Sequence, residues 1–224
     1  MNEAEFKDEL QREYQLRFAG TDAYRRAVWG ILTSEFFQPM LAPNEAILDL
    51  GCGWGEFINQ IQAARKFGMD LNPESRRRLA PGITFLEQDC SKPWAVPDGE
   101  LDTVFTSNFL EHLRTKDDLR ATLAQVHRCL KPGGRLICVG PNIKFLPGRY
   151  WDFWDHYLPL TELALREVLE LQGFTVDRCV GRFLPYTMSS QRPRPLWLVR
   201  AFLRVPWLWW TIGRQFLVVA RAAK

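Results

Sequence analysis

A glycine-rich loop that follows a short apolar run is the feature that most restricts how this chain can fold. The run Ala46-Ile47-Leu48-Asp49-Leu50 leads directly into Gly51-Cys52-Gly53-Trp54-Gly55. A short run without polar alternation is typical of a strand buried on both faces. Glycines let the backbone turn tightly and approach a ligand without a Cβ in the way. The pattern predicts an α/β fold whose ligand site lies beyond the carboxyl end of this strand.

Strand and helix patterns alternate along the rest of the chain. Further strands are predicted at 66–70, 83–87, 101–106, 134–140, 174–180 and 214–221, and helices at 3–18, 22–37, 54–64, 74–79, 116–129 and 161–171. Such alternation predicts a doubly wound, mostly parallel sheet in a single domain. We expect a helical cap over 1–44 and a ligand-binding core over 45–142. Residues 143–224 then hold a covering loop rich in aromatic residues, the last strands and a basic aromatic segment.

The spacing of the glycines in the loop limits which class of ligand the loop can bind. A dinucleotide site needs Gly-x-Gly-x-x-Gly, but position 56 is Glu and the third glycine is Gly55. Asp49 just before the loop would repel a pyrophosphate and suits a ligand with an ammonium or sulfonium group. Asp70 ends the second strand, where a carboxylate can accept both hydroxyls of a ribose. Asp89 and Cys90 follow the third strand, where an adenine would lie.

Five motifs follow one another in a characteristic order between Glu45 and Asn142. They are Ile47-Leu48-Asp49-Leu50-Gly51-Cys52-Gly53-Trp54-Gly55, Gly68-Met69-Asp70-Leu71-Asn72-Pro73, Gln88-Asp89-Cys90, Leu101-Asp102-Thr103-Val104-Phe105 with Leu110-Glu111-His112-Leu113, and Leu130-Lys131-Pro132-Gly133-Gly134. In these motifs the chain resembles the class I S-adenosylmethionine-dependent methyltransferases, most closely the small-molecule group that includes ubiquinone and menaquinone methyltransferases. The resemblance implies a Rossmann-like, seven-stranded sheet with an antiparallel last strand, and S-adenosyl-L-methionine as cofactor.

The same resemblance implies a set of cofactor-binding residues. The glycine loop would contact the methionine part, Asp70 the ribose, Asp89 and Cys90 the adenine, and Asn108 the methionine again. Cys52 and Cys90 are equally well explained as small residues packed in a tight place. The full expected set is Asp49, Gly51, Cys52, Gly53, Gly55, Asp70, Leu71, Asp89, Cys90 and Asn108.

The sulfonium methyl is already activated, so the chemistry is an in-line displacement that depends on positioning. A base is needed only for an acceptor such as a hydroxyl. The candidates are His156, in the aromatic loop, and His112, close to Asn108. His127 is expected on the surface or in packing, and Asp152 or Asp155 could orient His156. We expect no metal site, because the sequence shows no carboxylate cluster for one.

The absence of one motif limits which class of molecule can be the methyl acceptor. Enzymes that methylate the amino groups of nucleic-acid bases usually carry Asn/Asp-Pro-Pro-aromatic after the fourth strand, whereas this chain has Asn108-Phe109-Leu110-Glu111. We therefore expect a small-molecule or lipid- or glycan-linked acceptor, methylated at oxygen. Two alternatives stay open: an RNA methyltransferase that uses a basic tail, and a non-catalytic module that binds the cofactor and a partner.

Charge is distributed unevenly along the chain. The net charge is +3, yet residues 178–224 hold eight arginines and one lysine without any aspartate or glutamate. Segment 192–210 combines arginines with Trp197, Trp207, Trp209 and Trp210, a composition typical of membrane interfaces. We expect this segment on the side of the pocket opening, against an anionic membrane surface or a lipid-linked acceptor. The alternatives are packing under the sheet or a dimer contact.

Two further features bear on location. The five cysteines include no Cys-x-x-Cys pair, which argues against a disulfide framework or a zinc knuckle. The acidic start of the sequence lacks the basic-then-apolar order of a signal peptide. We expect a cytoplasmic protein, in part peripheral at the inner face of the membrane.

Overall fold

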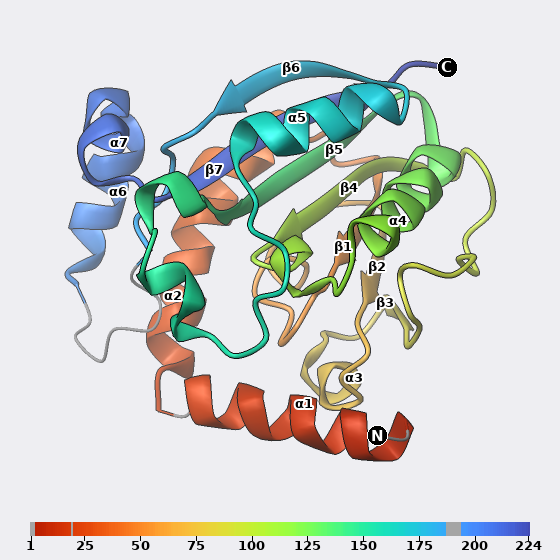
Figure 1. The fold of residues 1–224 in the computed structure, drawn as a ribbon, viewed down its shortest axis with the longest axis horizontal. Helices are drawn as coiled ribbons and strands as arrows, with labels where there is room; N and C mark the ends of the chain where they lie inside the picture. Colours follow the sequence, from red (N-terminus) through yellow and green to blue (C-terminus); the bar gives the residue numbers. More distant parts are fainter. Residues whose placement is uncertain (1–2, 19, 187–193) are drawn as a thin grey trace.

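A seven-stranded sheet forms the centre of the computed structural model, which describes residues 3–18, 20–186 and 194–224 (Figure 1). The strand order is β3-β2-β1-β4-β5-β7-β6. β7 runs antiparallel to both β5 and β6, while the other neighbours pair in parallel. The doubly wound, mostly parallel sheet with an antiparallel last strand is therefore confirmed. The strands are β1 Ala46–Leu50, β2 Arg65–Met69, β3 Ile83–Leu86, β4 Leu101–Ser107, β5 Leu130–Pro141, β6 Phe174–Val180 and β7 Gln215–Ala222.

Two helical layers cover the sheet. One face packs against α4 (Lys116–Cys129) and α5 (Glu162–Leu171), which bury residues such as Leu123 and Leu165. The other face packs against α2 (Asp22–Leu32), the π-helical turn η1 (Thr33–Phe37), α6 (Leu196–Arg204) and α7 (Pro206–Ile212). The remaining elements are α1 Glu3–Phe18, α3 Glu74–Arg78, and the short 3-10 turns η2 Gln38–Met40, η3 Leu110–His112, η4 Ile143–Phe145 and η5 Arg149–Asp152.

The segment after the glycine loop differs from its prediction. We expected a helix over 54–64, but residues 56–60 form hydrogen-bonded turns and the segment contains no regular helix. The backbone N–H of Ile58 faces the Asp49 carboxyl and lowers its pKa. Phe57, Ile58 and Ile61 still pack into the core beside α2. The apolar pattern therefore predicted correctly that these side chains are buried, but it predicted a helix where the backbone forms turns.

Smaller differences occur at other element boundaries. The predicted helix 22–37 ends as an α-helix at Leu32 and continues as the wider turn η1, in which Gln38 N–H donates to the Thr33 carbonyl. β5 begins at Leu130, before the predicted start at 134. Thr161 caps α5, because its hydroxyl accepts the Ala164 N–H at 3.1 Å. In the part of the chain that the structure describes, no helix combines the length and the apolar character that crossing a membrane requires.

Candidate active site

The glycine loop has a backbone that few other residues could adopt. Gly51, Gly53 and Gly55 have φ angles of 71°, 50° and 76°, in the left-handed region that favours glycine. A Cβ on Gly51 would lie 2.2 Å from the Phe109 ring. The N–H groups of Gly51 and Cys52 both donate to the Met69 carbonyl, at 2.9 and 3.0 Å. The loop is thereby tied to the end of β2 and lies close against the segment after β4.

Asp70, at the end of β2, presents a buried carboxylate to the same place. Its Oδ2 accepts the Gly53 N–H and its Oδ1 accepts the Asn72 N–H, both at 2.8 Å. Burial raises the pKa of Asp70, and these backbone N–H groups oppose the rise. A carboxylate oxygen can accept more than one hydrogen bond, so each oxygen can also take a hydroxyl. This geometry fits the expected ribose contact.

Asp49 is the second buried carboxylate beside the loop. Burial, followed by the negative charges of Glu56 and Asp70, raises its pKa well above the usual range, while the Ile58 N–H lowers it. Glu56 is paired with the buried Arg25 at 2.6 Å. A positive charge beside Asp49 and Asp70 would stabilise their ionised forms, so this part of the cavity favours a cationic ligand over a pyrophosphate.

A cavity of about 1160 Å³ brings the predicted cofactor residues together. Asn108 has a left-handed backbone with φ 49°, and its buried side-chain oxygen has no hydrogen-bond partner among the described residues. Gly55 does not line the cavity, because Asn59 and Leu79 occupy the space next to its Cα. The predicted residues that do line the cavity are Asp49, Gly51, Cys52, Gly53, Asp70, Leu71, Asp89, Cys90 and Asn108.

The two cysteines of the set are also held by the fold. Burial raises the pKa of Cys52 well above the usual range and that of Cys90 to about 12, so both thiols are neutral. The Thr122 hydroxyl lies 3.4 Å from the Cys90 sulfur, and the Trp94 indole donates to the Cys90 carbonyl at 2.8 Å. Asp89 accepts both the N–H and the hydroxyl of Ser91 at 2.8 Å. Packing and cavity lining therefore hold together for Cys52 and Cys90.

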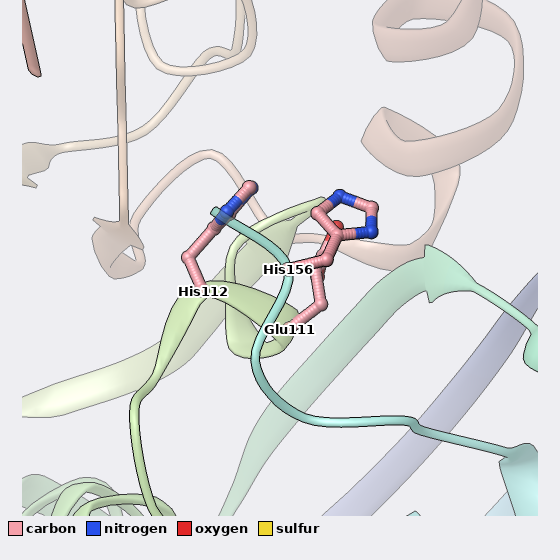
Figure 2. A group of neighbouring side chains, drawn as sticks. All are labelled: Glu111, His112 and His156. Carbon is pink, nitrogen blue, oxygen red and sulfur yellow. The ribbon is translucent and has the colours of Figure 1, made fainter. Parts of the chain in front are cut away.

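Glu111, His112 and His156 lie together at another part of the cavity wall (Figure 2). The first two belong to η3 after β4, and His156 belongs to the aromatic loop, whose backbone bonds to η3 through the Glu111 carbonyl. The two imidazole rings meet edge to face with centroids 5.0 Å apart. The fold thus brings together the two histidines that the sequence singled out, although they lie far apart in the chain.

Asp155 holds His112 rather than His156. His112 Nδ1 lies 3.0 Å from Asp155 Oδ2 and 2.9 Å from the Asp155 backbone oxygen. Because both neighbours are acceptors, Nδ1 carries a proton, and Nε2 is the basic nitrogen of the neutral ring. Burial lowers the pKa of His112, but the hydrogen bond that Nδ1 donates to Asp155 and the charge of Glu111 outweigh it and raise the pKa. The prediction that Asp155 orients His156 is replaced by this pairing.

In Glu111 and His156, by contrast, buried side-chain atoms have no hydrogen-bond partner among the described residues. The Glu111 side chain is about 1% exposed, and neither of its oxygens has a hydrogen-bond partner among the described residues. Burial raises its pKa to about 7. Burial and then the charge of His112 lower the pKa of His156 to about 4, and its Nδ1 is buried without a partner in the described residues. At neutral pH His156 is therefore a neutral ring.

The amino-terminal helix α1, part of the segment 1–44 in which a helical cap was expected, contributes Glu13 and Arg17 to the cavity wall. Arg17 of α1 donates two hydrogen bonds to Asp155, one of them 2.9 Å long to Oδ2, and its guanidinium lies 5.0 Å from the centre of the Phe153 ring. Asp155 is part-buried, yet His112 and Arg17 hold its pKa well below its usual range. Glu13 of α1 also lines the cavity, and burial raises its pKa. Only an amphipathic pattern marked this helix in the sequence.

The cavity therefore has two chemically different parts. One offers carboxylates and turn backbone to a nucleoside with a cationic group, and the buried Asn108 oxygen gives it a further polar contact. The other offers a histidine and a buried carboxyl group to a second molecule. Glu111, His112 and His156 each present one atom within 4.8 Å of the others, a spacing that would also suit a divalent cation. Such a cavity can hold a donor and an acceptor side by side.

Comparisons with known proteins show which family the chain is similar to. A family profile described as a methyltransferase domain matches residues 21–178. The chain is 28% identical over 141 residues to a demethylmenaquinone methyltransferase of Symbiobacterium thermophilum, covering 56% of this chain and 55% of that protein. It is 34% identical over 104 residues to a malonyl-acyl-carrier-protein O-methyltransferase of Hahella chejuensis, covering 41% and 35%. The match thus spans about half the length of the first of these relatives and a third of the second.

Solved structures share the fold over most of the chain. A S-adenosylmethionine-dependent methyltransferase from Archaeoglobus fulgidus superposes with a TM-score of 0.65 at 21% sequence identity, covering 88% of this chain and 94% of that one. A structure from Mesorhizobium loti with the same description gives a TM-score of 0.60 at 20% identity, covering 82% and 94%. At these identities the likeness concerns the architecture of the sheet and its helices.

Proposed function

We propose that this chain, which belongs to the class I S-adenosylmethionine-dependent methyltransferases, methylates an oxygen atom of a small or lipid- or glycan-linked acceptor. The observation that carries the proposal is the pairing of His112 with Asp155 in the cavity that also holds Asp49 and Asp70. A histidine fixed in this way is a suitable proton acceptor for a hydroxyl.

The residues have separate duties in this mechanism. When bound, S-adenosylmethionine supplies a methyl group on a sulfonium sulfur. Asp70 binds the ribose hydroxyls, and the loop with Asp49 holds the charged part of the cofactor. The acceptor oxygen would take up this methyl group and give up its proton, and S-adenosylhomocysteine would leave. His112 Nε2 takes the proton of the acceptor hydroxyl, while Asp155 holds Nδ1 and stabilises the imidazolium that forms.

His156 is better suited to shaping the acceptor site than to accepting the proton. Its pKa of about 4 makes it a weak base, and its ring is stacked on Phe153 and packed against Tyr150. We propose that His156 positions the acceptor and the His112 ring. Removing it should lower turnover by loosening the acceptor, while the cofactor, held at the other part of the cavity, is still bound.

The rim of the cavity supports an acceptor with an apolar part. Leu16, Trp154 and Tyr157 line the cavity and are largely exposed, so the entrance offers apolar surface. One relative is named for a quinone precursor and another for a carrier-linked acyl group. We propose an acceptor of this kind, met at the inner face of a membrane.

The test is to incubate the purified protein with methyl-labelled S-adenosylmethionine and a fractionated extract. We expect label in the lipid or small-molecule fraction, as an ether or ester. His112→Gln and Asp155→Asn should each lower the rate at saturating cofactor about 100-fold or more, the usual range for loss of a general base. The dissociation constant of S-adenosylhomocysteine should change little in both. His127→Gln is the matched control, because His127 packs against Phe174 on the other side of α4.

Other outcomes would point elsewhere. Label in RNA would replace the proposed acceptor by a nucleic acid. Label on a nitrogen or carbon of the acceptor would refute methylation at oxygen. Cofactor binding without label in any fraction would favour a non-catalytic binding module. A Glu111→Gln variant that loses activity while His112→Gln retains it would remove His112 as the proton acceptor.

A further inference from the structure

The helices α6 and α7 expose a group of large apolar side chains. Trp197, Trp207 and Trp210 are 65%, 66% and 71% exposed. We call Trp197, Leu198, Trp207, Trp210 and Ile212 the tryptophan surface. Large exposed apolar groups that are close in the chain mark an interaction site more often than isolated ones do.

The tryptophan surface is not the core-facing side of these helices. Phe202 and Leu203 of α6 and Trp209 of α7 are buried against the sheet and α2. The Trp209 indole also donates to the Phe202 carbonyl at 2.9 Å, which fixes the two helices together. The inward face is therefore complete, and Trp197 and Trp207 point to the opposite side. Packing under the sheet explains Trp209 but leaves the exposed tryptophans unexplained.

The charge around this surface is positive. Arg200 and Arg204 lie on the exposed side of α6 and share one acidic partner, Glu35, at 2.7 and 3.2 Å. The side chain of Arg204 is 73% exposed. Residues 194–214, which include both helices, contain four arginines and no acidic residue, so this segment keeps a positive charge after the pairing with Glu35. A surface of arginines and tryptophans complements anionic phospholipid headgroups, because the rings enter the interface and the guanidinium groups meet phosphates.

The segment just before α6 is hydrogen-bonded to α2, a helix that also contributes to the cavity wall. The Arg194 N–H donates to the Tyr24 hydroxyl at 2.9 Å, and Thr21 and Arg25, near Tyr24 on α2, line the cavity. Arg182 connects the end of α7 to the turn η4, which contains Phe145. Arg182 donates to the Thr211 carbonyl at 2.8 Å, and its guanidinium lies 4.6 Å from the centre of the Phe145 ring. Arg192 of the predicted segment lies outside the described residues.

We propose that the tryptophan surface docks the enzyme onto an anionic phospholipid membrane, with the cavity entrance beside the lipid. The docking itself requires only α6, α7 and their arginines. Its use to present a lipid-linked acceptor rests on the proposed function. Neither α6, with 9 residues, nor α7, with 7 residues, is long enough to cross a bilayer. The proposed docking therefore places both helices at the membrane surface.

Vesicle flotation of the whole chain tests this docking. The vesicles are phosphatidylcholine alone or phosphatidylcholine mixed with phosphatidylglycerol, at low and at high salt. We expect recovery with the anionic vesicles, reduced but not abolished by salt. Trp207→Ser with Trp210→Ser should lower the partition coefficient by roughly tenfold or more, and Arg200→Gln with Arg204→Gln should remove most of the preference for anionic lipid.

Matched controls separate docking from folding. Leu163→Ser with Leu171→Ser removes two exposed leucines from α5, so it should leave flotation unchanged. Calorimetry with S-adenosylhomocysteine shows whether each variant is folded. Binding to vesicles without methyl transfer to any extract fraction would sink the proposed function and leave the docking standing.

Three results would overturn the docking. The first is equal recovery of the wild type and the tryptophan variant with anionic vesicles. The second is salt-sensitive binding to RNA without binding to vesicles. The third is a dimer in light scattering that the tryptophan variant converts to a monomer, which would show that a second copy covers the surface.

Discussion

Replacing Glu111 by glutamine tests whether the acceptor part of the cavity contains a buried carboxyl group without partners. Its pKa rises from the ordinary value of 4.5 to about 7, chiefly through burial. His112 and Arg17 face Glu111 and lower its pKa, while Asp155 raises it. Glu111 in turn contributes to the raised pKa of Tyr150 and of Tyr186. The glutamine variant keeps the shape and removes the charge.

The sign and size follow from linkage. A folded pKa above the unfolded one means that the folded wild type binds its proton more tightly, so this contribution to stability is complete below about pH 4.5. It is lost as the pH rises through about 7. The difference between 4.5 and about 7 corresponds to about 3 kcal/mol, at about 1.4 kcal/mol for each pKa unit. Relative to the wild type, Glu111→Gln should therefore become more stable by up to this amount between about pH 5 and pH 8.

Urea unfolding at several pH values measures this difference. Any cost of burying the glutamine amide is the same at every pH, so only the pH-dependent part of the free energy of unfolding is diagnostic. Glu167→Gln on α5 changes an exposed carboxylate and controls for the loss of one negative charge. A difference between Glu111→Gln and wild type that stays constant with pH, or falls as the pH rises, would refute a buried carboxyl group of raised pKa.

Three further predictions concern the two parts of the cavity. Asp70→Asn should weaken S-adenosylhomocysteine binding about 10- to 100-fold, because it weakens hydrogen bonds to a charged group; an unchanged dissociation constant in calorimetry would show that the ribose is held elsewhere. Gly51→Ala should destabilise the protein more than Gly82→Ala in urea unfolding. Both glycines have positive φ, but only at Gly51 would the added Cβ overlap the Phe109 ring. Methyl transfer should survive a chelator, whereas loss of activity that a divalent cation restores would assign a metal to Glu111, His112 and His156.

The parts of the fold that the sequence predicted are those that depend on local pattern. Apolar runs marked the strands, and the acidic residues Asp49 and Asp70 at the carboxyl ends of β1 and β2 marked the cofactor part, because parallel strands end at one edge of the sheet. The helix predicted over 54–64 was wrong because buried apolar side chains such as Phe57, Ile58 and Ile61 do not require a helical backbone between them. The pairing of Asp155 with His112 and the closure by Arg17 join residues far apart in the chain. No spacing rule reaches such contacts.

The position of β7 has a consequence for how the chain is made. β6 precedes β7 in the chain but pairs only with it, and β7 in turn completes the edge of β5. As the ribosome extends the chain, β6 and the edge of β5 that faces away from β4 have no strand to pair with until residues 215–222 have left the exit tunnel. Residues 196–212, rich in tryptophan, emerge during this interval. The nascent chain therefore passes through a period in which an open sheet edge and an apolar segment are both exposed, and in which chaperones or a nearby membrane would protect it from aggregation.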